Sequence, residues 1–305
     1  MYGRLRRLPF LRGRNPIRFA QKALSEISVP PSPYTSSPLI TQEELEAQEA
    51  EIFKPFPHSL PGIDLNEAEQ LELLTAFAGY YKDLPFSAEK QEGLRYFFEN
   101  PMYSYSDAIC LYCMIRHVKP QRIIEVGCGY SSCAALDTNE LFFDNNIRCT
   151  FIDPYTDVLL RYMKPGDQGR HEIIPTRVQE VALEKFQALA ANDILFIDSS
   201  HVCKVNSDVN FLLFSVLPSL KTGVYVHFHD VFYPFEYPRQ WIYERWPFTE
   251  DYLLRAFLQY NRDFKIVFFN TFLEHFHEER FRREMPLCLQ NPGGSIWLQK
   301  VEGPG

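Results

Sequence analysis

The stretch Arg122-Ile-Ile-Glu-Val-Gly-Cys-Gly-Tyr-Ser-Ser132 decides the fold. It begins with a short, mostly apolar run of the kind found in strands that are buried on both faces of a sheet. Gly127 and Gly129 follow and allow the backbone to turn sharply and to approach a ligand closely. In an open α/β sheet, the crevice beyond the first strand is where nucleotide-like ligands bind. The stretch therefore predicts a strand, a ligand-binding turn and a helix.

Downstream of Gln121, short apolar segments alternate with longer helical stretches. The first five segments are separated by crossover lengths, which predicts parallel pairing through right-handed βαβ units. The last two have no comparable apolar helix between them, which favours an antiparallel final pair. The expected fold class is α/β, a Rossmann-like doubly wound, seven-stranded, mostly parallel sheet with an antiparallel last strand. The predicted strands are residues 122–126, 149–153, 172–176, 194–198, 224–230, 265–270 and 295–301.

Three regions are expected along the chain. Residues 1–40 form a basic tail and a Pro- and Ser-rich linker, residues 41–120 a helical N-terminal extension, and residues 121–305 the ligand-binding domain. An aromatic segment, residues 231–250, follows the fifth strand. It predicts either a lid over a flat substrate or a hydrophobic wrap over the sheet edge.

Two sequence signals mark helix starts in the N-terminal extension. Thr41 with Glu44, and Asn66 with Glu69, have the spacing of a capping box. Apolar residues recur at helical spacing after Asn66, so one helix is expected there. The later segment 102–107 is expected to form a wall opposite the aromatic segment.

Composition restricts the function classes. With 39 acidic and 31 basic residues, the net charge of −8 argues against nucleic acid as a partner. No run of about 18 apolar residues occurs, so stable membrane insertion is not expected. Seven scattered cysteines indicate reduced, buried thiols and a cytoplasmic protein. The alternative is organelle targeting, since six arginines and one lysine precede the first acidic residue, Glu26. A homo-oligomer is compatible with this composition.

The glycine turn argues against a dinucleotide. A full dinucleotide fingerprint requires a third glycine where this chain has Ser132. Two further acidic residues, Glu125 and Asp153, stand at the ends of the first and second strands. Ser131 and Ser132 can either hydrogen-bond the carboxylate of a cofactor or cap the helix that follows.

Polar side chains also end the fourth and fifth strands. Asp198 closes the fourth, and His229 with Asp230 closes the fifth. The carboxyl ends of neighbouring parallel strands meet at one edge of a sheet, so these groups are expected to converge. Carboxylate and imidazole ligands suit a divalent metal, with Mg²⁺, Mn²⁺ and Fe²⁺ as candidates. His227 shares a strand face with His229 and is expected to be a core residue or a support for the metal site.

Strand order, glycine loop and acidic strand ends together resemble the class I S-adenosylmethionine-dependent methyltransferases over residues 100–301. The resemblance implies S-adenosylmethionine as cofactor, with Glu125 near its methionine end and Asp153 at its ribose. It places Gln179 near adenine and Asp198 on the cofactor side as well as on the metal.

Within that family, the Asp198-Ser-Ser-His201 motif resembles metal-dependent small-molecule O-methyltransferases of the catechol type and the cephalosporin-hydroxylase-like group. His229 is a departure, because those proteins have a carboxylate there. His201 occupies the offset at which catechol-type enzymes carry a lysine base, and an imidazole can accept a proton near neutral pH. Lys204 is the second candidate for the base.

The expected function is metal-assisted transfer of a methyl group to a hydroxyl of a small-molecule acceptor. Two alternatives remain open. The first is a metal-independent methyltransferase that acts on a sugar or a nitrogen. The second is a non-catalytic protein that binds S-adenosylmethionine or NAD, because the fold alone does not fix the function.

Overall fold

A computed structural model describes residues 39–302. The chain divides into two compact units, Met1–Glu49 and Ala50–Gly305. Apart from its last two residues, the predicted tail and linker lie outside the described residues. The helix α2 (Gln42–Ile52) spans the boundary between the units and begins at the expected capping box. The amide of Glu44 donates to Thr41 Oγ1 (3.2 Å), and the amide of Thr41 donates to Glu44 Oε2 (2.9 Å).

The second unit is built on one seven-stranded sheet of order β3-β2-β1-β4-β5-β7-β6. The strands β1 to β5 pair in parallel, while β7 runs antiparallel to both β5 and β6. This confirms the predicted fold class and the antiparallel last strand. The bounds are β1 Arg122–Val126, β2 Arg148–Ile152, β3 Glu172–Ile174, β4 Ile194–Ile197, β5 Tyr225–His229, β6 Phe264–Phe269 and β7 Ser295–Lys300.

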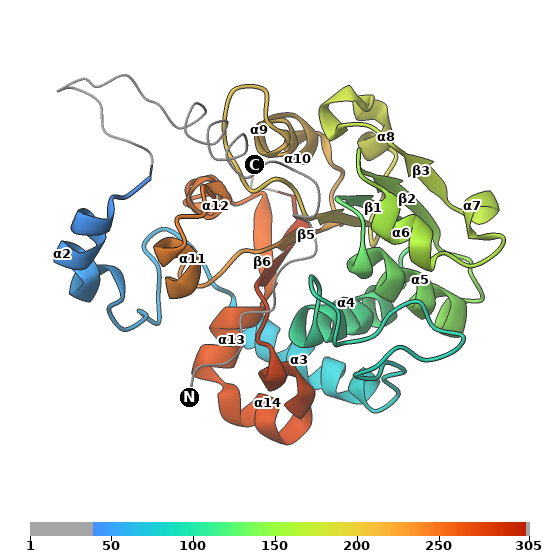
Figure 1. The fold of residues 1–305 in the computed structure, drawn as a ribbon, viewed down its shortest axis with the longest axis horizontal. Helices are drawn as coiled ribbons and strands as arrows, with labels where there is room; N and C mark the ends of the chain where they lie inside the picture. The colour runs from blue at the N-terminus through green and yellow to red at the C-terminus, as the bar shows by residue number, and fades with distance from the viewer. Residues whose placement is uncertain (1–38, 303–305) are drawn as a thin grey trace, which may run out of the picture. The chain divides into compact units, whose positions relative to one another are not determined.

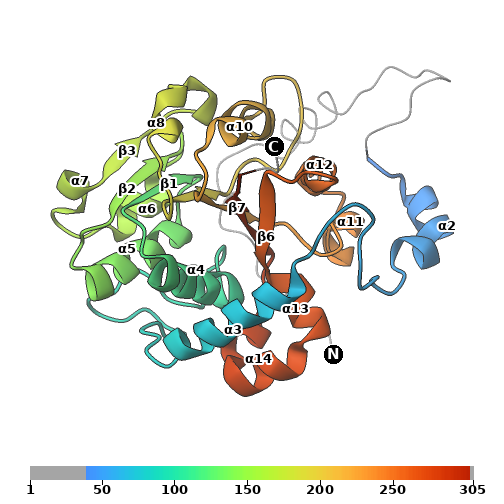
Figure 2. The ribbon, with the colours of Figure 1, turned by 180° about the vertical axis from the view of Figure 1, so that it is seen from behind.

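Helices cover both faces of the sheet. Figures 1 and 2 show α4 and α5 on one side and α8 and α10 on the other. The helices that precede β5 are α3 Glu67–Tyr81, α4 Tyr105–Val118, α5 Tyr130–Phe143, α6 Asp157–Tyr162, α7 Asp167–Arg170, η2 Val178–Glu180, α8 Leu183–Gln187, α9 Asp208–Phe211, η3 Leu212–Val216 and α10 Leu217–Ser219. Those that follow β5 are α11 Arg239–Tyr243, α12 Glu250–Leu258, α13 Asn270–Phe276, α14 Glu278–Glu284 and η4 Pro286–Gln290.

One expectation about helices was wrong, and one segment holds helices that were not predicted. Between β6 and β7, where no apolar helix comparable to the earlier crossovers is expected, lie the short helices α13, α14 and η4. The capping box at Asn66 does not form, although α3 does begin at the next residue. The backbone of Asn66 is left-handed (φ 54°), and its side-chain amide donates to the carbonyl of Ile266 instead (3.1 Å). A contact with β6 therefore replaces the local cap.

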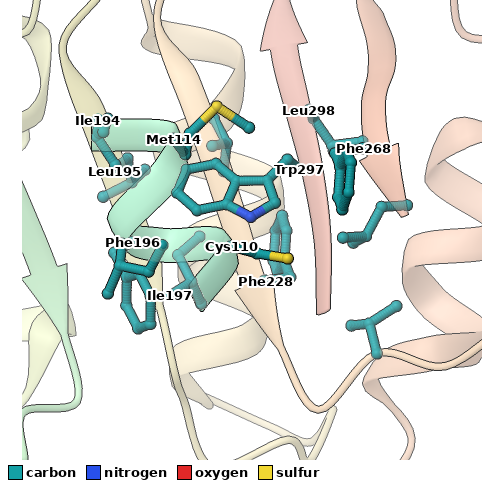
Figure 3. Packing of buried hydrophobic residues seen from close by; sticks show 14 of the residues in the cluster. Cys110, Met114, Ile194, Leu195, Phe196, Ile197, Phe228, Phe268, Trp297 and Leu298 are labelled. Carbon is teal, nitrogen blue, oxygen red and sulfur yellow. The ribbon is translucent and has the colours of Figure 1, made fainter. Parts of the chain in front are cut away.

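The core lies between the sheet and α4. Figure 3 shows Cys110 and Met114 of α4 together with Trp297 of β7 and Phe228 of β5. All four side chains are inaccessible to solvent. All seven cysteines are free, as predicted from their scatter. Within residues 39–302, none of the helices has the length and apolar character needed to cross a bilayer.

Candidate active site

The glycine loop after β1 lies against the end of β4. Gly127 has a left-handed backbone (φ +81°), and a Cβ atom there would lie 1.8 Å from the carbonyl oxygen of Asp198. The amide of Asp198 in turn donates to the carbonyl of Val126 (2.8 Å). Only glycine fits position 127 for both reasons. The backbone of Gly129 is extended (φ −177°), a conformation that any residue can adopt. The sharp turn expected at this position therefore does not require glycine.

Glu125 is buried below the glycine loop. Its Oε1 accepts a hydrogen bond from Ser131 Oγ (2.5 Å), and burial raises the pKa of the carboxyl to about 8. Ser132 Oγ accepts a hydrogen bond from the amide of Gly129 (3.1 Å). Of the two roles predicted for Ser132, this bond corresponds to capping of the helix that follows. The helix that follows the loop is thus tied back to both the loop and β1.

Asp153 faces the same loop from the end of β2. Its carboxylate accepts from the amides of Cys128 (2.9 Å) and Tyr155 (2.7 Å). Gln179 lies farther along the edge in η2, where its side-chain amide donates to the carbonyl of Asn206 (2.9 Å). The two acidic strand ends therefore border the glycine loop, whereas Gln179 contacts the segment after His201.

Two carboxylates and two imidazoles meet beyond β4 and β5. His201 Nε2 lies 3.4 Å from Asp198 Oδ1 and 3.5 Å from Asp230 Oδ2. His229 Nδ1 lies 3.4 Å from the same Asp198 oxygen and 3.8 Å from Asp230 Oδ1. Asp198, His201 and Asp230 present ligand atoms that all lie within 4.8 Å of one another. The predicted ligands and the predicted base thus form one cluster, in which His201 completes the three-residue group with the two aspartates and His229 Nδ1 faces both aspartates from β5.

The charges in this cluster perturb one another. Burial alone would raise the pKa of Asp198, yet His229 and His201 together lower it. Burial, with Asp198 close by, raises the pKa of Asp230. Burial would lower the pKa of both histidines, but the surrounding carboxylates raise it well above the ordinary range. Without a cation, the cluster therefore holds imidazolium ions beside carboxylates.

Glu250, at the start of α12, orients His201. Its Oε2 lies 2.8 Å from His201 Nδ1, and its Oε1 accepts from Ser199 Oγ (3.1 Å). The carbonyl of His201 accepts from the amides of Thr249 (2.8 Å) and Glu250 (3.2 Å). These bonds hold His201 in a left-handed conformation (φ +58°). Sequence reasoning missed Glu250, because it lies 49 residues from its partner and belongs to no motif.

His229 is oriented in the same way by Asp107 of α4. Asp107 Oδ2 lies 3.5 Å from His229 Nε2, and the carboxylate also accepts from the amide of Gly294 (3.2 Å). The ring of Tyr103 packs against the His229 ring with centroids 5.0 Å apart. The segment that was expected to form a wall of the site thus contributes Asp107 and Tyr103, although the orienting role of Asp107 was not foreseen.

Two other candidates lie outside the cluster. His227 is fully buried between Phe196 and Trp297, with ring centroids 4.1 and 4.5 Å away, and burial lowers its pKa well below the ordinary value. His227 is therefore a core residue, which is one of the two roles predicted for it. Lys204 is exposed, and among residues 39–302 it forms no ion pair with Asp198 or Asp230.

The aromatic segment 231–250 has two parts. Tyr233 and Phe235 are buried against Phe269, so the first part wraps the end of β6. In the second part, Phe248 packs on the ring of His201, with centroids 5.0 Å apart. Further rings pack around Phe248, namely Tyr237, Trp241 and Trp246. The second part therefore borders the cluster.

Comparisons with known proteins give one family profile and one relative of similar sequence. Residues 124–231 match the sequence profile of a family described as a methyltransferase domain. An uncharacterized protein from Archaeoglobus fulgidus is 32% identical over 163 residues, which cover 52% of this chain and 72% of that protein.

Solved structures with a similar trace include an apo structure of CmcI and the O-methyltransferase TomG from Streptomyces achromogenes in complex with SAM. For CmcI, the identity is 14% and the TM-score 0.43, over 70% of this chain and 77% of that one. For TomG, the values are 13% and 0.42, over 87% of this chain and 100% of that one.

The strand order, the glycine loop beside Asp198 and the matched profile define a nucleotide-type cofactor domain with a methyltransferase sequence. The chain belongs to the class I S-adenosylmethionine-dependent methyltransferases. S-adenosylmethionine is its cofactor, and the enzyme and its archaeal relative are members of one family.

Proposed function

We propose that this methyltransferase transfers the methyl group to a hydroxyl oxygen of a small-molecule acceptor, assisted by a divalent metal ion. The observation that carries the proposal is the cluster of Asp198, Asp230 and two histidines beside the glycine loop. The backbone of Gly127 lies directly against the carbonyl group of Asp198. A cofactor bound at the glycine loop would therefore lie beside the cluster. An acceptor hydroxyl bound between them would face the cofactor on one side and the cluster on the other.

The donor atoms fit a divalent metal ion. Asp198, His229 and Asp230 are proposed as its ligands, because the buried Nδ1 of His229 faces both carboxylates and has no hydrogen bond within the described part of the chain. A metal ion bound there would increase the acidity of an acceptor hydroxyl. Glu125, Asp153 and Gln179 are proposed on the cofactor side, as the family resemblance implies.

His201 is proposed as the general base. Its Nδ1 is held by Glu250, which leaves Nε2 directed at the cluster and stabilises the imidazolium after proton transfer. Its ring also packs on Phe248, at the border of the aromatic segment where an acceptor would bind. Asp198 and Glu250 keep the pKa of His201 high, against the lowering effect of burial. A cation bound to Asp198 would remove the part of this effect that Asp198 supplies and so bring the pKa of His201 down towards neutral pH.

The proton and electron balance is simple. Nε2 of His201 would take the proton of the acceptor hydroxyl. S-adenosylmethionine, when bound, would supply the methyl group to the acceptor oxygen and would leave as S-adenosylhomocysteine, with the electron pair of the broken carbon–sulfur bond on its sulfur. The aromatic segment excludes water from the reacting oxygen.

The test is transfer of a labelled methyl group to a panel of hydroxyl-bearing acceptors, with and without chelator. We expect chelator to abolish transfer and added metal to restore it. Asp198→Ala should lose metal binding and turnover while it retains S-adenosylhomocysteine binding. Full activity in chelator would instead select a metal-independent enzyme in which the His201–Glu250 pair acts alone on a sugar or a nitrogen.

A further inference from the structure

The inference concerns the metal ion of the proposed function and rests on that function. His229 occupies a position where a carboxylate would give the site oxygen ligands only. Its Nδ1 is sealed from solvent and forms no hydrogen bond with any residue between 39 and 302. The side chain is only 8% exposed. A buried imidazole nitrogen that faces two carboxylates at more than hydrogen-bond length leaves room for a cation that all three groups can bind in place of the imidazolium proton.

The spacing of the donor atoms suits one ion. His229 Nδ1 lies 3.4 Å from Asp198 Oδ1 and 3.8 Å from Asp230 Oδ1. Ligand atoms that bind one ion at about 2.1 Å lie roughly 3 to 4 Å from one another. Both distances fall in this range, so Nδ1 of His229 can share an ion with each of the two carboxylates.

Asp107 prepares the imidazole for this role. It lies 3.5 Å from Nε2, the far nitrogen of the His229 ring, and has no place among the three ligands. A carboxylate behind the far nitrogen of a metal-bound histidine fixes the tautomer that leaves the near nitrogen free to bind. Asp107 is itself held by the Gly294 amide, so its position does not depend on His229.

We propose that this site selects a first-row transition ion, such as Mn²⁺ or Fe²⁺, over Mg²⁺, through direct binding by the Nδ1 of His229 that Asp107 orients. Mg²⁺ prefers oxygen ligands and retains its waters, whereas imidazole binds transition ions well. Replacing one carboxylate of an all-oxygen site by imidazole also removes one negative charge, which weakens Mg²⁺ further.

The test uses the purified full chain, stripped of metal and titrated with Mn²⁺ in the presence of Mg²⁺. Free Mn²⁺ is measured by electron paramagnetic resonance. We expect Mn²⁺ to bind at least about 100-fold more tightly than Mg²⁺, and His229→Asp to reduce that ratio by about tenfold or more. Asp107→Asn should weaken Mn²⁺ binding by about 10 to 100-fold. His277→Asn is the matched control, since His277 pairs with Glu67 (2.7 Å) outside the site.

A second measurement does not depend on any variant. Pulsed resonance of the Mn²⁺-loaded wild-type protein should show coupling to a directly bound ¹⁴N nucleus. His229→Gln should remove this coupling and His201→Gln should retain it. Absence of nitrogen coupling in the wild type, or its loss only in His201→Gln, would overturn the proposal. If Mg²⁺ alone binds and supports transfer, the metal-assisted function stands and this inference fails.

Discussion

Gly127 is the position where the addition of a single methyl group should reduce stability and cofactor binding most. A Cβ atom there would overlap the carbonyl oxygen of Asp198, and the left-handed backbone disfavours any other residue. We expect Gly127→Ala to lower the free energy of unfolding by about 3 kcal/mol or more and to abolish S-adenosylhomocysteine binding. Urea denaturation and calorimetry measure the two effects. Gly79→Ala is the control, because that helical position has open space and should be neutral or slightly stabilised.

Glu125 should make the cofactor-free enzyme less stable as the pH rises. Its pKa is raised by burial from 4.5 to about 8, so the folded state retains a proton that the unfolded state loses near pH 4.5. Stability should therefore be fully present below pH 4.5 and fall by about 1 kcal/mol per pH unit up to pH 8. The difference between the wild-type and Glu125→Gln unfolding curves across this range isolates the contribution. Parallel curves would show that Glu125 ionises normally.

The residues that carry the site differ in how far sequence predicts them. Asp198 and His229 lie at the ends of neighbouring parallel strands, so topology brings them together, and His201 follows Asp198 by three residues. Glu250 and Asp107 orient the two histidines from helices outside the motifs, and their positions follow from packing that no local pattern encodes.

Among the elements, the segment before α4 is attached to the sheet domain by one buried ion cluster. The Arg95 guanidinium contacts Asp137 of α5 (2.7 Å) and Asp167 of α7 (2.8 Å), and all three side chains are almost fully buried. We expect Arg95→Met to lower the free energy of unfolding by about 3 to 5 kcal/mol, because two buried carboxylates lose their partner. In urea denaturation, Arg177→Met, which breaks the exposed pair with Glu180, should stay within about 0.5 kcal/mol of wild type.

The start of α12 and the loop after β4 act as one element. Cys203 donates its amide to Thr249 Oγ1 (2.8 Å), and Glu250 binds both Ser199 and His201. Glu250→Gln should lower kcat by about 10 to 100-fold with little change in S-adenosylhomocysteine affinity, because only the orientation of the base changes. Glu67→Gln, in the comparable pair with His277, should not alter turnover. An equal loss in both variants would mean that Glu250 is only structural.

Element prediction succeeded where the pattern was long or repeated. All seven strands were predicted, since each combines apolar side chains with flanking turn residues. The helices α13 and α14 were missed because each has only seven residues, too few turns for a recognisable period. Their stability comes from packing. Figure 2 shows α14 beside α3, and Arg280 of α14 donates to Thr75 of α3 (2.8 Å).

At the scale of the whole molecule, the sheet begins near Gln121, but the hydrophobic core also includes residues that precede it in the sequence. The helix α4 precedes β1, and twelve of its 14 residues are buried. Its side chains belong to the same cluster as those of the sheet. The division at Gln121 therefore marks the start of the sheet, while the hydrophobic core crosses it.

This shared core leads to opposite expectations for two shortened chains. Residues 50–305 form one compact unit, so a chain reduced to them should unfold cooperatively and bind S-adenosylhomocysteine like the full chain. A chain of residues 121–305 lacks α4, including Ile109, Tyr112 and Met114. Losing each such core side chain costs about 2 to 5 kcal/mol, against a total stability of about 5 to 15 kcal/mol.

Circular dichroism, urea denaturation and calorimetry on both shortened chains measure the outcome. We expect the shorter chain to lack a cooperative transition and to bind no S-adenosylhomocysteine. Cooperative unfolding of residues 121–305 would show that the sheet folds without α4. The folded chain of residues 121–305 would then lack Asp107. Weaker Mn²⁺ binding by that chain than by the full chain would show the effect of Asp107 on His229.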